Sequence, residues 1–313
     1  MASENLVGRL LEHARRLTPE AAAPFIARAF DAGTDLVERI VRVWDPLTPP
    51  LRLRLHIGPF LNSRVYRLSA ERNVLALREL CDLETTAHVL DIGCGCGRMA
   101  AAFTRFLNRS GTYDGFDAAR EPIEWCQENI ASRFSNFRFR CSDTFSPRYN
   151  PGGRVRAADL TFPYGDNRFD LTFAASVYTH MMPKEVANFV GETARVLRPG
   201  GLNFATFCLL NDRTLPLVAA GNSSPQLPHS LEDCRVRDLS DPASFIAQRE
   251  TSIRALYSKA ALRIIEPIRY GTWVGSADRS EMSSPYGFNQ DIVIAVKLCS
   301  SNRESLSVGP APE

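Results

Sequence analysis

The chain has 313 residues, of which 44% are hydrophobic and 23% are charged. This composition is that of an ordinary globular protein, which excludes a disordered chain, a collagen-like fibre and a small disulfide scaffold. The length allows one large domain or one domain with an appendage. A net charge of +2 does not favour nucleic acid or a lipid surface as partner, and no apolar run approaches the ~18 residues of a membrane span.

The N-terminal residues carry charges through their first helical pattern and lack the layout of a signal peptide. We therefore expect a cytoplasmic protein whose eight cysteines are reduced thiols. Cys94 and Cys96 are separated by a single residue, whereas structural zinc sites use pairs separated by two residues together with a second pair. We therefore predict no metal site.

The first 80 residues have a helical character. Apolar spacing predicts helices over residues 6–17 and 36–44. Leucine and arginine alternate over residues 51–55, which favours a short strand or an extended arm. Ser69 is a predicted N-cap for a helix that runs to about Cys81. Residues 1–80 thus form a predicted helical N-terminal extension.

After this extension, short strands alternate with helices. The predicted strands cover residues 88–91, 112–116, 137–140, 170–174, 202–207, 262–268 and 292–298. The predicted helices cover residues 98–107, a segment with Pro122 near its first turn, and a segment from Pro183 to Gly200-Gly201. This alternation predicts an α/β fold with a doubly wound, mostly parallel sheet. Residues 211–230 are a predicted loop or lid, and residues 300–313 a flexible tail.

The most informative segment is a glycine-rich turn after the first predicted strand. Gly93, Gly95 and Gly97 stand between an apolar strand and a helix. Glycine permits left-handed backbone angles and lets a ligand approach the main chain, and such turns bind nucleotides in open α/β sheets. Asp117 ends the second strand, 20 residues after Gly97, where a carboxylate accepts hydrogen bonds from both ribose hydroxyls.

Two classes of nucleoside ligand compete for this turn. Dinucleotide enzymes use G-x-G-x-x-G, with the pyrophosphate against the helix N-terminus, whereas this turn is G-x-G-x-G followed by Arg98. Asp91 precedes the first glycine by two residues, and its carboxylate would repel a pyrophosphate but attract an ammonium group. The turn therefore favours a ligand with an adenosine half and an amino-acid half, S-adenosylmethionine (SAM).

Taken together, these motifs resemble those of the class I SAM-dependent methyltransferases. The resemblance rests on Val89–Gly97, Asp117, the strand Phe169–Ala174 and the segment Arg195–Gly201. It covers residues 81–299 and implies a seven-stranded sheet with an antiparallel last strand, and SAM as cofactor.

Carried over position by position, the resemblance implies a set of cofactor contacts. Asp91 would face the methionine amino group, the three glycines would line the methionine half, and Asp117 would hold the ribose. An acid after the third strand usually lies beside the adenine. Asp143 matches it, and Asp159 is a rival because an insertion follows the third strand. Ser176, after the fourth strand, would border the methionine side and the reacting methyl group.

The segment after the fourth strand supplies candidates for chemistry. Methyl transfer depends on alignment, and holding donor and acceptor in line at about 3–3.5 Å contributes ~7–11 kcal/mol of barrier reduction. A hydroxyl acceptor also needs a base, for which His180 is the candidate; the alternative is that it packs against or caps the helix at Pro183. We predict Tyr178 as a wall of the acceptor pocket. Trp273 either stacks on a ring or sugar face of the acceptor or is a core aromatic.

The predicted function is O-methylation of a small-molecule, sugar or natural-product acceptor. The stretch around His180 is similar to S-V-F-T-H in some bacterial methyltransferases that act on sugars and natural products. The alternatives are an N-methyltransferase of the same fold, an NAD-dependent oxidoreductase and a non-catalytic SAM-binding partner protein. Residues 1–80 would cap the acceptor site and offer helices for a homodimer, and residues 81–299 would bind SAM.

Overall fold

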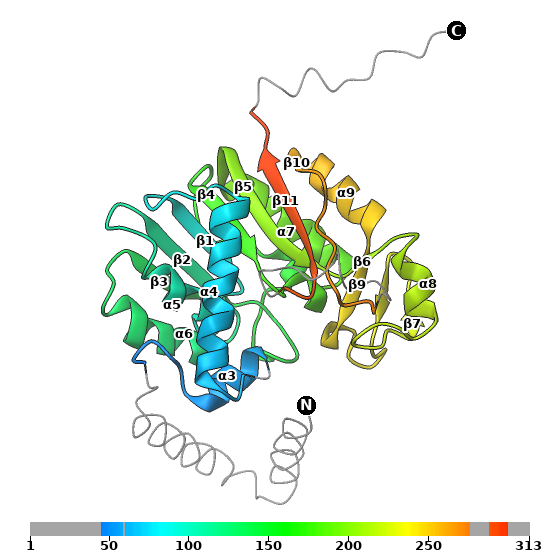
Figure 1. Ribbon diagram of the computed structural model, residues 1–313, viewed down its shortest axis with the longest axis horizontal. Coiled ribbons are helices and arrows are strands. Elements are labelled where there is room, and N and C mark those ends of the chain that lie inside the picture. The colour runs from blue at the N-terminus through cyan, green and yellow to red at the C-terminus, as the bar shows by residue number, and fades with distance from the viewer. Residues whose placement is uncertain (1–44, 59, 276–287, 300–313) are drawn as a thin grey trace, which may run out of the picture.

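A computed structural model describes residues 45–58, 60–275 and 288–299 (Figure 1). The helices predicted over residues 6–17 and 36–44, the homodimer surface assigned to them and the tail 300–313 lie outside the described residues.

A seven-stranded sheet forms the centre of the described part, in the order β10-β11-β5-β4-β1-β2-β3. Its strands are β1 (His88–Ile92), β2 (Thr112–Asp117), β3 (Phe137–Cys141), β4 (Phe169–Ala174), β5 (Leu197–Phe207), β10 (Leu262–Ile264) and β11 (Asp291–Lys297). β1 to β5 pair in parallel, while β11 is antiparallel to β5 and β10. The predicted doubly wound, mostly parallel sheet with an antiparallel last strand is confirmed.

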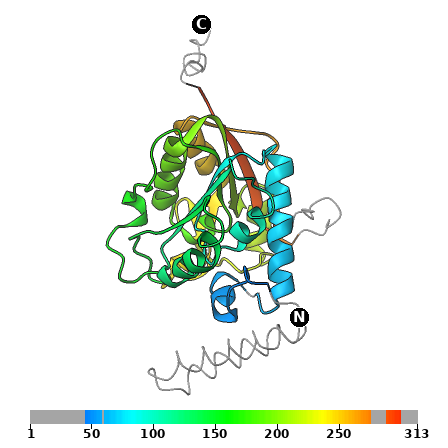
Figure 2. The ribbon, with the colours of Figure 1, turned by 90° about the vertical axis from the view of Figure 1, so that its left-hand side faces the viewer.

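Helices cover both faces of this sheet (Figures 1 and 2). One face carries α4 (Ser63–Leu80), α5 (Arg98–Phe103) and α6 (Arg120–Cys126), and the other carries α7 (Pro183–Val196) and α9 (Glu250–Lys259). Successive strand residues point to opposite faces, so Val89 packs with α4 and α5 whereas Leu90 packs with α7. Strands buried on both faces explain the continuous apolar runs in the sequence.

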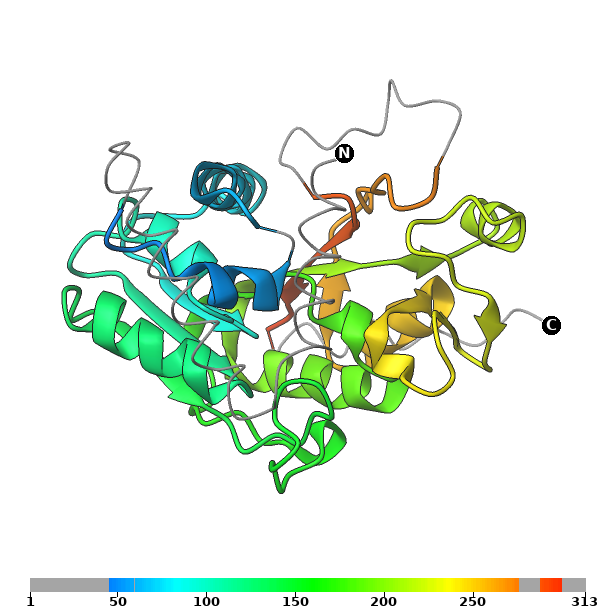
Figure 3. The same cartoon turned by 90° about the horizontal axis from the view of Figure 1, so that it is seen from below.

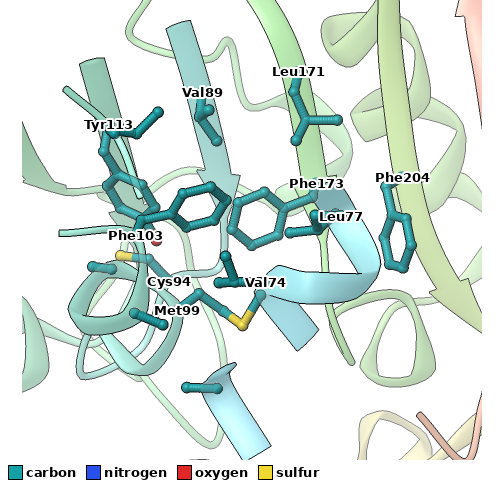
Figure 4. Packing of buried hydrophobic residues seen from close by; sticks show 14 of the residues in the cluster. Val74, Leu77, Val89, Cys94, Met99, Phe103, Tyr113, Leu171, Phe173 and Phe204 are labelled. Atoms are coloured by element: carbon teal, nitrogen blue, oxygen red, sulfur yellow. The ribbon is translucent and has the colours of Figure 1, made fainter. Parts of the chain in front are cut away.

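Aromatic rings fill the α4 and α5 face (Figure 4). The Phe103 ring of α5 lies between those of Tyr113 and Phe173, with centroids 5.5 Å and 5.9 Å away. Leu77 of α4 is fully buried in the same cluster. α4 lies before the predicted domain boundary at residue 81, yet it packs in the core of the sheet. That boundary stays a prediction.

The N-terminal part of the described chain corrects two predictions. Residues 51–57 form the helix α3 (Leu51–Ile57) and no strand, because Leu51 and Arg54, which lie three residues apart on one side of a helical turn, are both buried. α4 begins at Ser63 and not at Ser69, because the Asn62 side chain accepts hydrogen bonds from the backbone of Arg64 and Val65 at 2.8 and 3.2 Å.

The Gly200-Gly201 pair has a different role from the predicted one. α7 ends at Val196, and β5 begins at Leu197 and runs through both glycines. The pairing of β4 with β5 shifts its register between Phe169 and Leu171. Gly200 has φ +79°, so the pair forms an irregular start of a strand. α5 also ends earlier than predicted, at Phe103, and β10 at Ile264.

A second, smaller sheet follows β5, in the order β6-β9-β8-β7. Its strands are β6 (Leu209–Leu210), β7 (His229–Ser230), β8 (Cys234–Val236) and β9 (Ile246–Arg249), and α8 (Thr214–Ala219) lies beside β6. The predicted loop over residues 211–230 therefore contains a helix and a strand. Strands of two to four residues are too short to show a hydrophobic period.

None of the helices in the described part of the chain is both long and apolar enough to cross a membrane.

Replacing Leu77 with alanine should lower the free energy of unfolding by about 2–5 kcal/mol, because it leaves a cavity between α4 and the sheet. Leu75, on the same helix, is 41% exposed, and Leu75→Ala should change the free energy by less than about 0.5 kcal/mol. Urea-induced unfolding measures both variants. Equal losses would contradict the orientation of α4.

Candidate functional site

A cleft of about 250 Å³ lies at the carboxyl ends of β1 to β4. β1 and β4 are neighbours in the sheet, although β2 and β3 intervene in the chain. Open α/β sheets bind their ligands at such a switch point. The cleft is lined by the glycine turn after β1 and by the residues that follow β2, β3 and β4. α3 lies at the same end of the sheet (Figures 1 and 3).

The glycine turn brings bare main chain to the cleft wall. Gly93 and Gly95 line the cleft with φ +76° and +52°. A Cβ at Gly93 would lie 2.7 Å from Val177 Cγ2, and one at Gly95 would lie 2.7 Å from Ile57 Cγ2. Gly97 does not line the cleft. It is the N-cap residue of α5, with φ +72°, and a Cβ at this position would lie 2.7 Å from Ile130 Cδ1 and 2.9 Å from Cys126 Sγ.

Asp117 lines the cleft beside this turn. Its Oδ2 accepts a hydrogen bond from the Gly95 backbone at 2.8 Å, and its Oδ1 accepts one from Ala119 at 2.9 Å. Burial raises the pKa of Asp117, and these backbone hydrogen bonds oppose the increase. An ionised carboxylate has about four acceptor sites, so each oxygen keeps capacity for a ligand hydroxyl.

Asp91 lies behind the turn and does not line the cleft. It is 3% exposed, and it accepts a hydrogen bond from the buried Tyr113 hydroxyl. Burial raises the pKa of Asp91 to about 7, although the hydrogen bond from Tyr113 and the charge of Arg98 lower it. The structure therefore separates Asp91 from the other predicted cofactor contacts.

The two acids predicted near the adenine do not line the cleft either. Asp143 pairs with Arg154 at 2.7 Å and Asp159 pairs with Arg156 at 2.6 Å. The hydrogen bond from Arg154 lowers the pKa of Asp143. Ser142 and Thr144 line the cleft instead, and their hydroxyl oxygens are 2.8 Å apart. The structure thus brings hydroxyl groups to the carboxyl end of β3.

His180 lines the cleft from a short 3-10 turn, Tyr178–His180. Its Nδ1 is 2.9 Å from the carbonyl oxygen of Ala243. A carbonyl only accepts, so Nδ1 carries the hydrogen and the neutral ring keeps its lone pair on Nε2. Burial lowers the pKa of His180. The cap of α7 comes from Glu185, whose side chain accepts from the Met182 backbone at 2.7 Å.

Tyr178 and Trp273 are core residues and do not line this cleft. Tyr178 is fully buried, and its ring stacks on that of Phe207 at 4.9 Å. Trp273 is 3% exposed and donates its indole N–H to Asp291 at 2.9 Å. The structure therefore agrees with the alternative that Trp273 is a core aromatic. It does not agree with the prediction that Tyr178 forms a wall of the acceptor pocket.

Two segments complete the rim of the cleft: one belongs to the N-terminal extension predicted to cap the acceptor site, and sequence reasoning did not assign the other to the site. His56 and Ile57 come from α3, and Phe145 to Tyr149 come from the insertion after β3. The rings of His56 and Tyr149 meet edge to face at 5.0 Å, so the two segments touch. The length of the insertion was a signal that could have been read from the sequence. The alternation of leucine and arginine over residues 51–55, by contrast, favoured a strand and so hid the helix α3.

Within the described ranges, no group of three or more histidine, cysteine or acidic side chains is placed to hold a metal ion. Cys94 and Cys96 are buried free thiols. The sulfur of Cys94 occupies the space over Gly115, where a Cβ would lie 2.9 Å from it.

Known proteins resemble this chain over the region of the cleft. Residues 89–201 match a family model described as a methyltransferase domain. The methyltransferase GfsG of Streptomyces halstedii is 30% identical over 135 residues, 42% of each chain. The ubiquinone biosynthesis O-methyltransferase of Bradyrhizobium sp. (strain ORS 278) is 28% identical over 153 residues, 48% of this chain and 50% of that one. The chain thus spans half or less of the length of these two relatives.

The fold also has a counterpart among solved structures. The PH0226 protein from Pyrococcus horikoshii OT3 superposes with a TM-score of 0.50 at 20% identity, and the match covers 75% of this chain and 92% of that one. This likeness shows the fold of the sheet and its helices.

Replacing Gly95 with alanine should lower the free energy of unfolding by at least about 1–2 kcal/mol, the cost of a left-handed backbone at a residue with a Cβ. Displacement of Ile57 adds to this loss. Gly191 lies in α7 with no neighbour within 4 Å, so Gly191→Ala should leave stability unchanged or raise it by about 0.5–1 kcal/mol. Thermal unfolding distinguishes them. A harmless Gly95→Ala would contradict the packing of the turn.

Proposed function

Because this chain belongs to the class I SAM-dependent methyltransferases, we propose that it transfers the methyl group of SAM to a hydroxyl of a small-molecule or sugar acceptor. The observation that carries the proposal is the convergence of Asp117, the bare glycine turn and His180 on one cleft. These groups come from the ends of three different strands, and each has the chemistry that one part of the reaction needs.

The cofactor would lie across the carboxyl ends of β1 to β3. Gly93 and Gly95 offer the close main-chain approach that the methionine half needs. Asp117 would accept hydrogen bonds from the ribose hydroxyls, and Ser142 and Thr144 would border the adenine in place of a carboxylate. Bound in this way, SAM would supply an electrophilic methyl group, and its sulfonium sulfur would leave as a neutral thioether.

The acceptor would enter from the side of His180. A hydroxyl group loses its proton when it is methylated, and the neutral ring of His180 has its lone pair on Nε2 to accept that proton. The Ala243 carbonyl holds the ring in this tautomer. The remaining walls are mostly apolar or aromatic, with Phe145, Met181 and Phe189 among them, and they would exclude water and orient the acceptor.

Two matched relatives are named O-methyltransferases, the ubiquinone biosynthesis enzyme and cnsE of Penicillium expansum, which is 28% identical over 116 residues. Their names and the base beside the cleft favour a hydroxyl acceptor. A nitrogen acceptor has its own lone pair and depends less on a base, so the same fold with N-methylation is the alternative.

Replacing Asp117 with asparagine should weaken binding of S-adenosylhomocysteine (SAH), the demethylated product, about 10- to 100-fold. The reason is the loss of charge-assisted hydrogen bonds, each of which contributes about 1.5–3 kcal/mol. Asp143→Asn is the control, because Asp143 faces Arg154 outside the cleft. Titration calorimetry measures both. A comparable loss of SAH affinity in Asp143→Asn would indicate that Asp143 contacts the adenine. Absence of SAH and SAM binding to the unmodified protein would refute the proposed function.

Replacing His180 with alanine should lower turnover by about 10²–10⁴-fold while SAH affinity changes less than about twofold. The measurement is SAH release with a panel of catechols, phenols and sugars as acceptors. Burial holds the pKa of His180 below 6.5, so its base form predominates at pH 7. Turnover should therefore be flat above pH 7 and fall as the pH drops below 6.5, and this acidic limb should be absent from the variant.

His229, in the small sheet and absent from the lining of the cleft, provides the control His229→Ala, which should keep full turnover. Full turnover of His180→Ala would reject the base and favour a nitrogen acceptor. SAH binding without turnover on any acceptor of the panel would instead indicate a non-catalytic partner protein.

A further inference from the structure

Several polar side chains of the cleft lining already have hydrogen-bond partners within the protein. Asp117 accepts from two backbone N–H groups at 2.8 and 2.9 Å, and Glu185 accepts from the Met182 backbone at 2.7 Å. Ser176, which follows β4, also lines the cleft, and its hydroxyl donates to Gln290 Oε1 at 3.1 Å. These groups are thus held in place by the protein itself.

Arg148 is a charged residue of the lining that has no partner of this kind. It belongs to the insertion after β3, lines the cleft and is exposed. Among the residues that the structure describes, no carboxylate forms an ion pair with it. Arg154 of the same insertion, by contrast, pairs with Asp143 at 2.7 Å. Arg148 therefore presents to the cleft a positive charge that no described carboxylate neutralises.

Aromatic rings hold this guanidinium at the rim of the cleft. The Arg148 Cζ atom lies 5.6 Å from the centroid of the Tyr149 ring, which is a cation–π distance. The Tyr149 ring in turn meets that of His56, from α3, edge to face at 5.0 Å. Because contact with a ring face uses no N–H group, the hydrogen-bond donors of the guanidinium remain available to a ligand.

The charge of Arg148 also acts on the proposed base. Burial lowers the pKa of His180 and that of His56, and the positive charge of Arg148 adds to both decreases. The guanidinium therefore lies near both rings, on the side from which the acceptor would enter. Asp241, an acid whose charge acts on the pKa of His180 in the opposite direction, does not line the cleft.

The surroundings of Arg148 favour an anion with an apolar body as its partner. Arginine binds carboxylate and phosphate groups through two parallel N–H···O bonds. The nearby walls include Phe145, Met181 and Phe189, which suit an apolar or aromatic body. A neutral acceptor that covered Arg148 would remove water from the guanidinium without replacing its hydrogen bonds to an anion, which costs free energy.

We propose that Arg148 binds an anionic group of the acceptor, a carboxylate or a phosphate, while His180 faces the hydroxyl that is methylated. The acceptor is then a hydroxylated acid with an apolar body, and Arg148 is a residue that determines specificity. This inference rests on the proposed function, because it assumes that the acceptor occupies the end of the cleft beside His180. It narrows the class of acceptor that this function takes.

The test measures binding of phenols to the SAH-loaded protein by titration calorimetry. The probes para-hydroxybenzoate and para-hydroxycinnamate carry a carboxylate at two distances from the hydroxyl, and para-hydroxyphenyl phosphate carries a phosphate. The amides of the two acids are their neutral counterparts. At least one anion should bind about tenfold more tightly than the amides. The affinities of the carboxylates relative to the phosphate then show which of the two groups Arg148 prefers.

Arg148→Gln should weaken binding of the preferred anion about tenfold, whereas the affinities for the amides and for SAH should change less than about twofold. Unchanged SAH binding also shows that the cleft of the variant is folded. Arg148→Lys keeps the charge and should keep a preference of at least about threefold for the anion. The matched control is Arg154→Gln, because Arg154 is held by Asp143 and does not line the cleft. It should leave every affinity unchanged.

Anions that bind no more tightly than the amides, or not at all, would overturn the inference, as would a preference that survives in Arg148→Gln. The proposed function would still stand in either case if the protein binds SAH and methylates neutral phenols. A loss of SAH affinity in Arg148→Gln as large as the loss for the anion would overturn the inference in favour of a contact with the cofactor. If the unmodified protein binds neither SAH nor SAM, the proposed function fails and this inference fails with it.

Discussion

The close packing of the glycine turn against its neighbours is the constraint on which the cleft depends. A side chain at Gly93 would collide with Val177, and one at Gly95 would collide with Ile57. Two segments that are distant in the sequence, the end of β4 and the N-terminal helix α3, thus meet at one turn. Because interiors tolerate little change in volume, a shift of this turn would move both the strand end that leads to His180 and the helix that forms the rim.

Burial acts in opposite directions on the acid and the base of this cleft. Removal from water disfavours the charged form, so it raises the pKa of Asp117 and lowers that of His180. Two backbone N–H groups that bond Asp117 oppose this increase in its pKa. His180 needs no such compensation, since its neutral form is the one a base requires. Burial in one cleft is therefore compatible with the roles proposed for both groups, because each of them has its local hydrogen-bond partners.

The strands and the glycine turn were predictable from sequence because they depend on local rules. Strands buried on both faces are mostly apolar, and a turn with positive φ favours glycine. The site residues depended more on tertiary contacts. Asp143 fits the spacing of an adenine contact, yet Arg154 holds it outside the cleft, and the buried hydroxyl of Tyr113 does the same for Asp91. Neither partner is visible from spacing along the chain.

The acceptor side of the cleft illustrates why family motifs identify a reaction better than a substrate. The motifs lie at the carboxyl ends of neighbouring parallel strands, which meet at one edge of the sheet. Their functional groups therefore come together whatever the sequence of the surrounding loops. The opposite wall is assembled from His56 of α3, Tyr149 of the insertion and Ala243 before β9, which share no periodic pattern. Each reaches the cleft through a contact with another segment, such as the edge-to-face rings of His56 and Tyr149. The shape that selects an acceptor is therefore a property of these long-range contacts, and changes in α3 or the insertion would alter it without disturbing the turn that receives the methyl donor.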